Sequence, residues 1–168
     1  MSKELLKEFS QTIGAEIPEK LVDDISKVEE NHYNLITTPE HAYQLMKILY
    51  DAGVYHLSTI TGMEKENEFH VIYHLQYRIE EEIREIPINF FVTKIDKENP
   101  KTPSMVDLFI AADYYEREVY DLYGIYFENH PFLNRIILPE KWPADVHPLR
   151  KEYSVEDLKK IASEVVKK

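Results

Sequence analysis

The chain has 168 residues, of which 31 are acidic and 20 are basic, so its formal net charge is −11 at pH 7. This length fits one domain with its own core, and the acidic balance disfavours binding to nucleic acid or to anionic lipid. Because the chain contains no cysteine, disulfides, thiolate catalysis and cysteine-ligated zinc or iron–sulfur centres are excluded within it. A partner with a basic surface is the natural counterpart.

The N-terminal segment MSKELLKEFSQ is charged and amphipathic, and it lacks the apolar core of a signal peptide. No run of about 18 or more apolar residues occurs, so we expect no membrane-spanning helix. Lys, Glu, Ile and Tyr are plentiful whereas glycine is scarce, a composition that hints at a thermophilic source.

The first third of the chain alternates between helix and strand patterns. Thr38 and Pro39 are typical of a helix start, and Gly53 is typical of the residue that follows a helix end. In chain order we expect a helix over residues 2–12, a helix or strand over 21–28, a strand over 32–37, a helix between Thr38 and Gly53, and a strand over 54–61 closed by Gly62.

Residues 69–79 alternate between apolar and polar side chains and predict a strand with one buried face. The acidic run Glu80-Glu81-Glu82 predicts a turn, and residues 86–92 predict the returning strand of a hairpin. Pro87 within this second strand indicates a sheet edge or a strand beginning. A polar loop is expected over 96–103.

The longest helical pattern runs from Val106 to Tyr123 and ends at Gly124. Residues 125–153 then contain four prolines, several aromatic residues and little periodicity. Long irregular segments inside compact domains are normally functional or disordered, and the apolar content here argues against disorder. We therefore predict an extended arm that needs a surface to lie on, followed by an amphipathic helix that Ser154 and Asp157 open.

These elements predict an α+β fold, with a small and mostly antiparallel sheet whose helices pack on one face. Residues 1–124 form the α+β domain. Residues 125–168 form the extended docking arm and the C-terminal helix, within the same structural unit.

Seven histidines and several carboxylates invite hypotheses of metal binding or acid–base catalysis. His70 and His74 lie on a predicted strand, where four residues span about 13 Å, so they cannot share one ion and are expected to face solvent. On the long helix, Asp113 and Asp121 each lie one turn from Arg117, a spacing that predicts ion pairs on the helix surface. No glycine-rich phosphate loop or nucleophile motif is present.

A denser pattern of charge spans the end of the long helix and the arm. It consists of Glu116, Arg117, Glu118, Asp121, His130, Arg135, Trp142, His147, Pro148, Leu149, Arg150 and Lys151. Arginine pairs bidentately with carboxylate and fixes the register of the groups it joins. The residues alone leave two interpretations open: a network that ties the arm to its own helix, or an interface shared with a partner.

These residues resemble the 30 kDa subunit family of respiratory NADH dehydrogenase (complex I), which also has members in membrane-bound nickel–iron hydrogenases. The family signature is ERE, two residues, an acid, two apolar or aromatic residues, six more and a histidine. Here it reads ERE-VY-D-LY-GIYFEN-H, from Glu116 to His130. The downstream segment HPLRKEY also resembles the family, and the close match covers about residues 103–153.

The resemblance implies a non-catalytic, peripheral subunit on the cytoplasmic face of the cell membrane. Its partners would be a large hydrogenase-like (49 kDa-type) subunit and a small cluster-bearing subunit, with membrane contact only through the complex. This chain would hold no catalytic residue, metal or cofactor, whereas iron–sulfur clusters, and a nickel–iron site in hydrogenase-type complexes, would lie in its partners. Electrons would pass through those partners to quinone, protons or a sulfur compound, coupled to ion translocation.

The twelve residues named above would then dock the chain on its partners. Because the chain ends soon after the second motif, we expect no fusion to the large subunit, and this short form and the composition favour an archaeal hydrogenase-related complex. Two alternatives stay open. One is a stand-alone hydrolase that uses the acidic helix and His130, and the other is a free scaffold protein that binds unrelated partners through the arm.

Overall fold

A computed structural model describes residues 2–29, 31–79 and 84–167. The elements in chain order are α1 (Lys3–Ile13), the 3-10 turn η1 (Glu19–Leu21), β1 (Asp24–Glu29), β2 (His32–Thr37), α2 (Pro39–Asp51), β3 (His56–Glu64), β4 (Glu68–Ile79), β5 (Arg84–Asp96), β6 (Lys101–Pro103), α3 (Ala112–Tyr123), β7 (Tyr126–Glu128) and α4 (Val155–Lys167).

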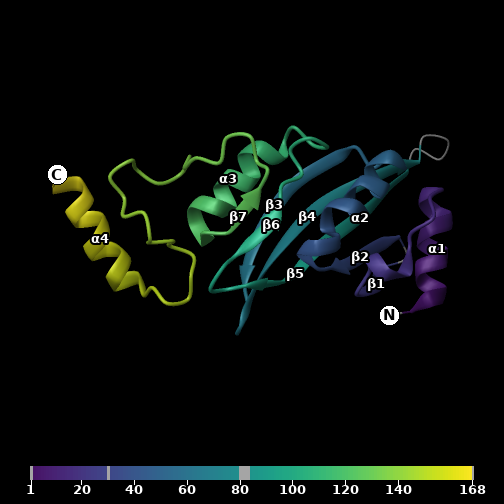
Figure 1. Cartoon of the computed structure of the whole chain (residues 1–168), viewed down its shortest axis with the longest axis horizontal. Coiled ribbons are helices and arrows are strands. Elements are labelled where there is room, and N and C mark those ends of the chain that lie inside the picture. The colour runs from purple at the N-terminus through teal and green to yellow at the C-terminus, as the bar shows by residue number, and fades with distance from the viewer. Residues whose placement is uncertain (1, 30, 80–83, 168) are drawn as a thin grey trace.

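Five strands form the main sheet in the order β1-β2-β5-β4-β3, seen best in Figure 1. Only the β2–β5 pair is parallel, and the other three pairs are antiparallel. A mostly antiparallel sheet was predicted and is confirmed, as is the hairpin of β4 and β5. The short strands β6 and β7 pair in parallel as a separate ribbon.

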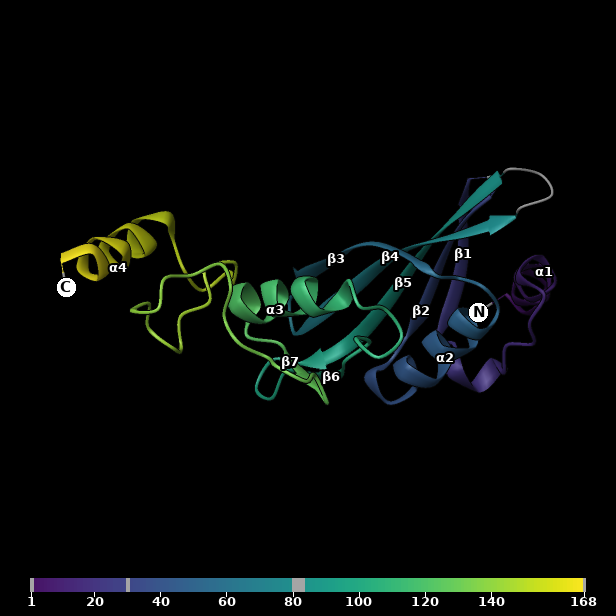
Figure 2. The ribbon, with the colours of Figure 1, turned by 90° about the horizontal axis from the view of Figure 1, so that it is seen from above.

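α1, α2 and α3 pack on one face of the sheet, as predicted, whereas α4 lies beyond the arm (Figure 2). The rings of Phe9 in α1 and Tyr33 in β2 lie 4.9 Å apart between centroids. Near the other end, Gly62 in β3 approaches Tyr123 of α3 so closely that a Cβ would lie 2.6 Å from the ring. The pairing registers place Tyr33 and Gly62 on the same face, and the core lies between that face and the helices.

The opposite face of the sheet carries a row of hydrogen bonds across four strands. His74 bridges Thr61 of β3, through Nε2 at 3.0 Å, and Asn89 of β5, through Nδ1 at 2.9 Å. The amide nitrogen of Asn89 continues the row to His32 and Asn34 of β2, both at 2.9 Å. Polar side chains that bond one another along a sheet explain how this face stays without a helical cover.

Pro87 lies inside β5, the central strand of the sheet, which begins at Arg84, so the expectation of a sheet edge or a strand beginning is wrong. Its residue pairs with Gln76 of β4, whereas pairing of β5 with β2 begins at Ile88. Among the described strands, β5 therefore pairs with one neighbour at this residue, where the missing N–H of proline is tolerated more easily than between two paired strands.

Several predicted boundaries are wrong. Residues 106–111 form turns rather than the first turns of α3, because Leu108 and Phe109 donate to the Met105 carbonyl and then the chain bends. β3 runs through Gly62 instead of ending there. Part of the expected polar loop pairs as β6, and the ambiguous segment 21–28 mostly forms β1. The predicted turn at Glu80–Glu82 lies outside the described residues.

His70 corrects another expectation, since its side chain is buried rather than solvent-facing, and it contacts Glu68. A bulge between Phe69 and Val71 interrupts the alternation of β4 at this point. His74 is half-buried within the polar row.

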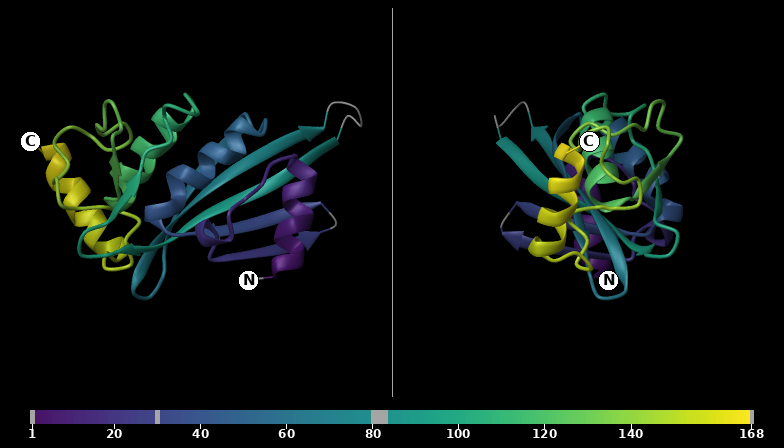
Figure 3. Two further views of the ribbon diagram at one scale, coloured as in Figure 1. Left: turned by 45° about the vertical axis from the view of Figure 1, so that its right-hand side comes forward. Right: turned by 90° about the vertical axis from the view of Figure 1, so that its left-hand side faces the viewer.

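The arm and α4 extend the molecule away from α1, and α4 lies at the far end (Figures 1 and 3). Ser154 and Asp157 cap α4 reciprocally, as predicted: the Asp157 N–H donates to Ser154 Oγ at 3.2 Å, and the Ser154 N–H donates to Asp157 Oδ2 at 3.2 Å. Within the described residues, no helix is long and apolar enough to span a bilayer.

Candidate docking site

The end of α3 is the point at which the arm joins the body. Gly124 follows the helix with a φ of 72°, the left-handed conformation that favours glycine. It also leaves room for the arm, because a Cβ on residue 124 would lie 2.5 Å from His147 Nε2 and 2.6 Å from Arg150 Nη2. Glycine is required here for two independent reasons.

The segment His147–Arg150 caps the exposed carbonyls of α3. His147 Nδ1 donates to the carbonyl of Asp121 at 2.9 Å, the Leu149 N–H donates to that of Leu122 at 3.1 Å, and Arg150 Nε donates to that of Tyr123 at 2.7 Å. These carbonyls have no partner within a helix, and they carry the negative end of its dipole. The second motif therefore completes the helix that holds the first.

The surroundings of His147 favour the neutral form of its ring. Burial is the main cause that lowers its pKa below the usual value, and the nearby guanidinium of Arg150 acts in the same direction. Arg150 supplies the positive charge at the helix end instead, and it also lies over the ring of Phe69 at 5.2 Å.

Asp121 anchors the middle of the arm. Its side chain is fully buried, and Oδ2 accepts from the backbone N–H groups of Ile136, Ile137 and Leu138 at 3.2, 2.9 and 2.8 Å. Oδ1 lies 3.3 Å from Arg135 Nε, off the line of a hydrogen bond, so this contact is an ion pair only. Three donors converging on one carboxylate oxygen hold the arm to α3.

Arg135 in turn stabilises the loop that follows. Its Nη atoms donate to the carbonyls of Trp142, Pro143 and Ala144 at 3.0 to 3.1 Å. The indole N–H of Trp142 donates to the Val146 carbonyl at 3.0 Å. This irregular loop is ordered by its own polar contacts, which agrees with the prediction that the segment is not disordered.

Glu116 fixes the other side of α3 to the sheet. It is fully buried and accepts from Ser104 Oγ at 2.6 Å, from the Met105 N–H at 2.7 Å and from the hydroxyl of Tyr73 at 3.4 Å. Burial raises the pKa of this carboxyl to about 7, against the opposing effect of these donors. Sequence reasoning missed Ser104 and Tyr73, because nothing in their spacing links them to residue 116.

The ion pairs predicted along α3 are absent from the described residues. Arg117 instead donates through Nε to the Asn134 carbonyl at 3.0 Å, and its guanidinium lies 5.9 Å from the ring centroid of Tyr114 and 5.7 Å from that of Phe132. The backbone carbonyl of Asp113 accepts from His130 Nε2 at 3.3 Å, and the same nitrogen lies 3.3 Å from Asp113 Oδ1. The arm thus provides the partners that the helical spacing alone assigned to neighbouring turns.

His130 has both ring nitrogens engaged. Nδ1 accepts from the Phe132 N–H at 3.0 Å, and Nε2 faces Asp113. Neither nitrogen is free to serve as a general base, so the geometry offers no support for the hydrolase alternative. In the part of the chain that the structure describes, no three His, Asp or Glu side chains gather closely enough to hold a metal ion.

A second set of arm and helix residues points outward. Glu118 and Leu149 are exposed, and Pro148 is half-buried. Lys151 is exposed as well, although its backbone N–H donates to Glu64 of β3 at 2.6 Å. Large apolar side chains of the arm and of the start of α4 are exposed beside them: Phe132, Ile136, Ile137, Leu149 and Val155.

The structure therefore separates the twelve predicted residues. Glu116, Arg117, Asp121, His130, Arg135, Trp142, His147 and Arg150 make contacts within the chain, whereas Glu118, Leu149 and the Lys151 side chain face outward. The first group fits the interpretation of an intrachain network. A docking role for any of the twelve stays a prediction.

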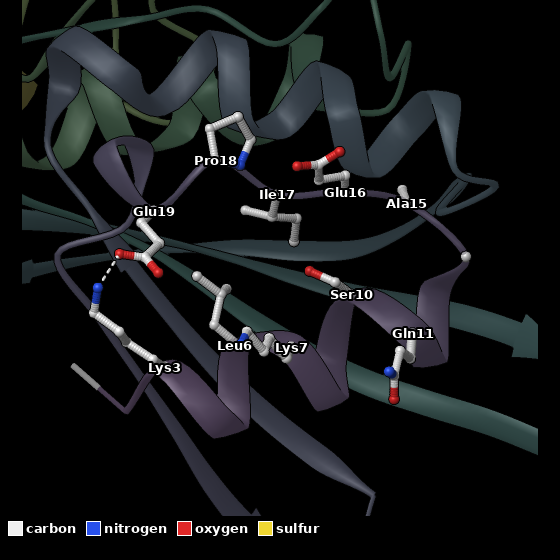
Figure 4. Close-up of a pocket in the computed structure, with 11 residues that line it drawn as sticks. Lys3, Leu6, Lys7, Ser10, Gln11, Ala15, Glu16, Ile17, Pro18 and Glu19 are labelled. Carbon is white, nitrogen blue, oxygen red and sulfur yellow. Dashed lines mark ion pairs between the residues drawn. The ribbon is translucent and has the colours of Figure 1, made fainter.

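A groove of about 500 Å³ lies at the other end of the molecule, between α1 and the segment that follows it (Figure 4). Leu6 and Ile17 line its floor, and Lys3 pairs with Glu19 across its rim at 2.7 Å. It is distant from the arm and shares no residue with the candidate docking site.

Residues 35–159 match the family model described as respiratory-chain NADH dehydrogenase, 30 kDa subunit, which covers all of α3 and the arm. The chain belongs to this family. A relative from Roseiflexus castenholzii, a subunit of NADH-quinone oxidoreductase, is 33% identical over 140 residues, which are 80% of this chain and 65% of that protein. A chloroplastic NAD(P)H-quinone oxidoreductase protein of Cucumis sativus is 37% identical over 68% of this chain and 72% of that protein.

Other family members are considerably longer than their match to this chain. An NADH-quinone oxidoreductase protein from Chloroherpeton thalassium is 48% identical over 62 residues, which are 37% of this chain and only 25% of that protein. The match thus spans a quarter of that relative. These relatives are subunits of an oxidoreductase complex.

Two solved structures share the fold. "Nqo5 of the trypsin-resistant fragment (1-134)" is 26% identical, with a TM-score of 0.59 over 79% of this chain and 100% of that one. A chain from "the membrane-bound sulfane sulfur reductase (MBS), an archaeal respiratory membrane complex" has a TM-score of 0.68 over 96% of this chain and 91% of that one. At 18% identity the second likeness concerns the fold alone.

Proposed function

We propose that this chain is a non-catalytic peripheral subunit of a complex I-like membrane oxidoreductase, docking on a large hydrogenase-like subunit and a small cluster-bearing subunit. The iron–sulfur clusters, and a nickel–iron site where one exists, belong to those partners, and electrons pass through them to quinone, protons or a sulfur compound, coupled to ion translocation. The complex contacts the cytoplasmic face of the membrane through its other subunits.

The exposed apolar side chains of the arm support this proposal. Its polar side chains and backbone are bonded to α3, so the arm is ordered, yet Ile136, Ile137 and Leu149 remain exposed upon it. An ordered segment that displays large apolar side chains is typical of a surface that another protein covers. In α4, Leu158 and Ile161 are only half-buried, which extends the same surface.

Co-purification tests the proposal directly. A tag at the N-terminus lies away from the arm, and extraction in mild detergent keeps membrane complexes intact. We expect the large and the small cluster-bearing subunits to accompany the chain, and we expect the double change Ile136→Ser and Ile137→Ser to reduce their recovery. Val28→Ser is the matched control, because Val28 is equally apolar and exposed but lies on β1.

Recovery of the chain alone, or equal recovery of partners with arm variant and control, would contradict the proposal. Elemental analysis of the isolated chain distinguishes the hydrolase alternative, which predicts turnover or a bound metal. Limited proteolysis distinguishes the free scaffold, since an arm that docks in a complex gains protection only when those partners are present.

A further inference from the structure

A second exposed surface lies along α3 and includes one side chain of the arm. Ile110, at 87% exposure, precedes the helix; Tyr114, at 65%, lies in its first turn, and Arg117 follows three residues later. Phe132, at 62% exposure, reaches this row from the arm. We name these four residues the α3 strip.

Arg117 holds the α3 strip together. Its guanidinium lies 5.9 Å from the ring centroid of Tyr114 and 5.7 Å from that of Phe132, and Nε donates to the Asn134 carbonyl. Two exposed aromatic rings therefore lie within cation–π distance of one arginine. Tyrosine and arginine are the residues that dominate binding energy at protein interfaces, and residues fixed in advance lose less entropy on binding.

The charge of Arg117 is left without a carboxylate. Its terminal nitrogens make no hydrogen bond or ion pair with any residue that the structure describes, although the chain is strongly acidic. The nearest acids along α3 have other partners: Asp113 pairs with His130, and Asp121 binds the arm. Glu118, the next residue, is exposed and makes no hydrogen bond or ion pair with a described residue.

We propose that the α3 strip receives a carboxylate side chain of a neighbouring protein of the complex, set among apolar groups that cover Ile110, Tyr114 and Phe132. The two Nη groups of Arg117 form a planar fork that matches a carboxylate bidentately. A partner that covers the aromatic rings also removes water from the Nη groups of Arg117. Because a buried charge without a hydrogen-bond acceptor is costly, the partner must supply that acceptor. The inference rests on the proposed function, and it adds the chemistry of one contact.

Zero-length cross-linking in the assembled complex tests this contact. Arg117→Lys places an amine where the guanidinium lies, and a carbodiimide joins an amine only to a carboxylate that touches it. We expect mass spectrometry to find residue 117 linked to an Asp or Glu of a partner protein. Arg78→Lys, an exposed change on β4, is the matched control and should give no link of this kind.

Hydroxyl-radical footprinting of the wild-type complex provides a second measurement that needs no variant. Tyr114 and Phe132 should be oxidised several-fold less in the complex than in the isolated chain. Tyr55, at 66% exposure, is the comparison residue of matched type.

Arg117→Gln should also weaken retention of the partner by about tenfold or more, the size expected for a central interface arginine.

The outcomes separate this inference from the proposed function. If the partners co-purify but residue 117 links only within its own chain, and the two rings stay fully reactive, the α3 strip is not an interface and the proposed function stands. If no partner protein is recovered, both fail.

Discussion

Gly124 and His147 lie so close that a Cβ on the glycine would sit 2.5 Å from the imidazole Nε2. The end of α3 and the second motif can therefore pack at this distance only because residue 124 has no side chain. These two residues, 23 positions apart in the sequence, are held at contact distance, and any side chain at position 124 must push them apart.

Gly124→Ala should destabilise the protein more than the same change at Gly14. Both glycines end helices with positive φ, of 72° and 69°, so alanine costs about 1–2 kcal/mol of conformational energy at each site. Only at position 124 does the new Cβ meet the arm, which adds about 1–3 kcal/mol. Urea unfolding of the two variants measures the difference, and equal losses would mean that the arm yields freely.

Removing the carboxylate of Asp121 should release the centre of the arm. Asp121→Ala leaves three N–H groups without their acceptor and Arg135 without its ion-pair partner, and hydrogen bonds to a charged group contribute about 1.5–3 kcal/mol. Hydrogen exchange at residues 136–138 should accelerate. Glu118→Ala, an exposed change on the same helix, should alter stability by less than about 0.5 kcal/mol.

Glu116 should make stability depend on pH. Its pKa is raised from 4.5 to about 7, so between those values the folded state holds a proton that the unfolded state has lost. Stability from this group is present below pH 4.5 and is lost as pH rises to about 7, a change of about 3 kcal/mol.

Glu116→Gln removes this titration. Denaturant unfolding should be measured for both proteins at pH 5 and pH 8. The free energy of unfolding of the variant, relative to that of the wild type, should be larger at pH 8 than at pH 5. A difference between the two proteins that stays constant across this range would show that Glu116 is already ionised in the folded state.

Arg150→Ala and Glu118→Ala should both weaken the retention of partners, but for different reasons. Arg150 caps α3 and covers Phe69, so its loss also lowers the free energy of unfolding, by about 1–3 kcal/mol. Glu118 is exposed and makes no hydrogen bond or ion pair with a described residue, so its loss should affect retention alone. Co-purification and unfolding measured on the same two variants separate the effects, and full retention of partners by both would remove these residues from the interface.

Local patterns predicted most of the fold, because β4 and β5 alternate with period two and α2 has clear start and stop residues. The helix before Gly124 was predicted too long. Met105, Phe109 and Ala112 are buried at spacings that a helix would also give, although the chain turns there. The ribbon of β6 and β7 was missed, since three-residue strands are too short to show periodicity.

The site was predicted as a set of residues but not as a set of contacts. The ERE and HPLR motifs mark the right segments, and the structure shows them joined at the end of α3. Which donor meets which acceptor depends on the path of the irregular arm, which carries no periodic signal. The pairing of Asp121 with three successive backbone N–H groups is of this kind.

The capping of α3 by the arm also has a mechanical meaning. The arm cannot move independently of α3, because a displacement of His147 or Arg150 breaks the hydrogen bonds that these side chains donate to carbonyls at the helix end. The same helix is fixed to the sheet through Glu116 and Tyr73. The arm, α3 and β4 are therefore joined by one continuous set of hydrogen bonds, from His147 to Tyr73.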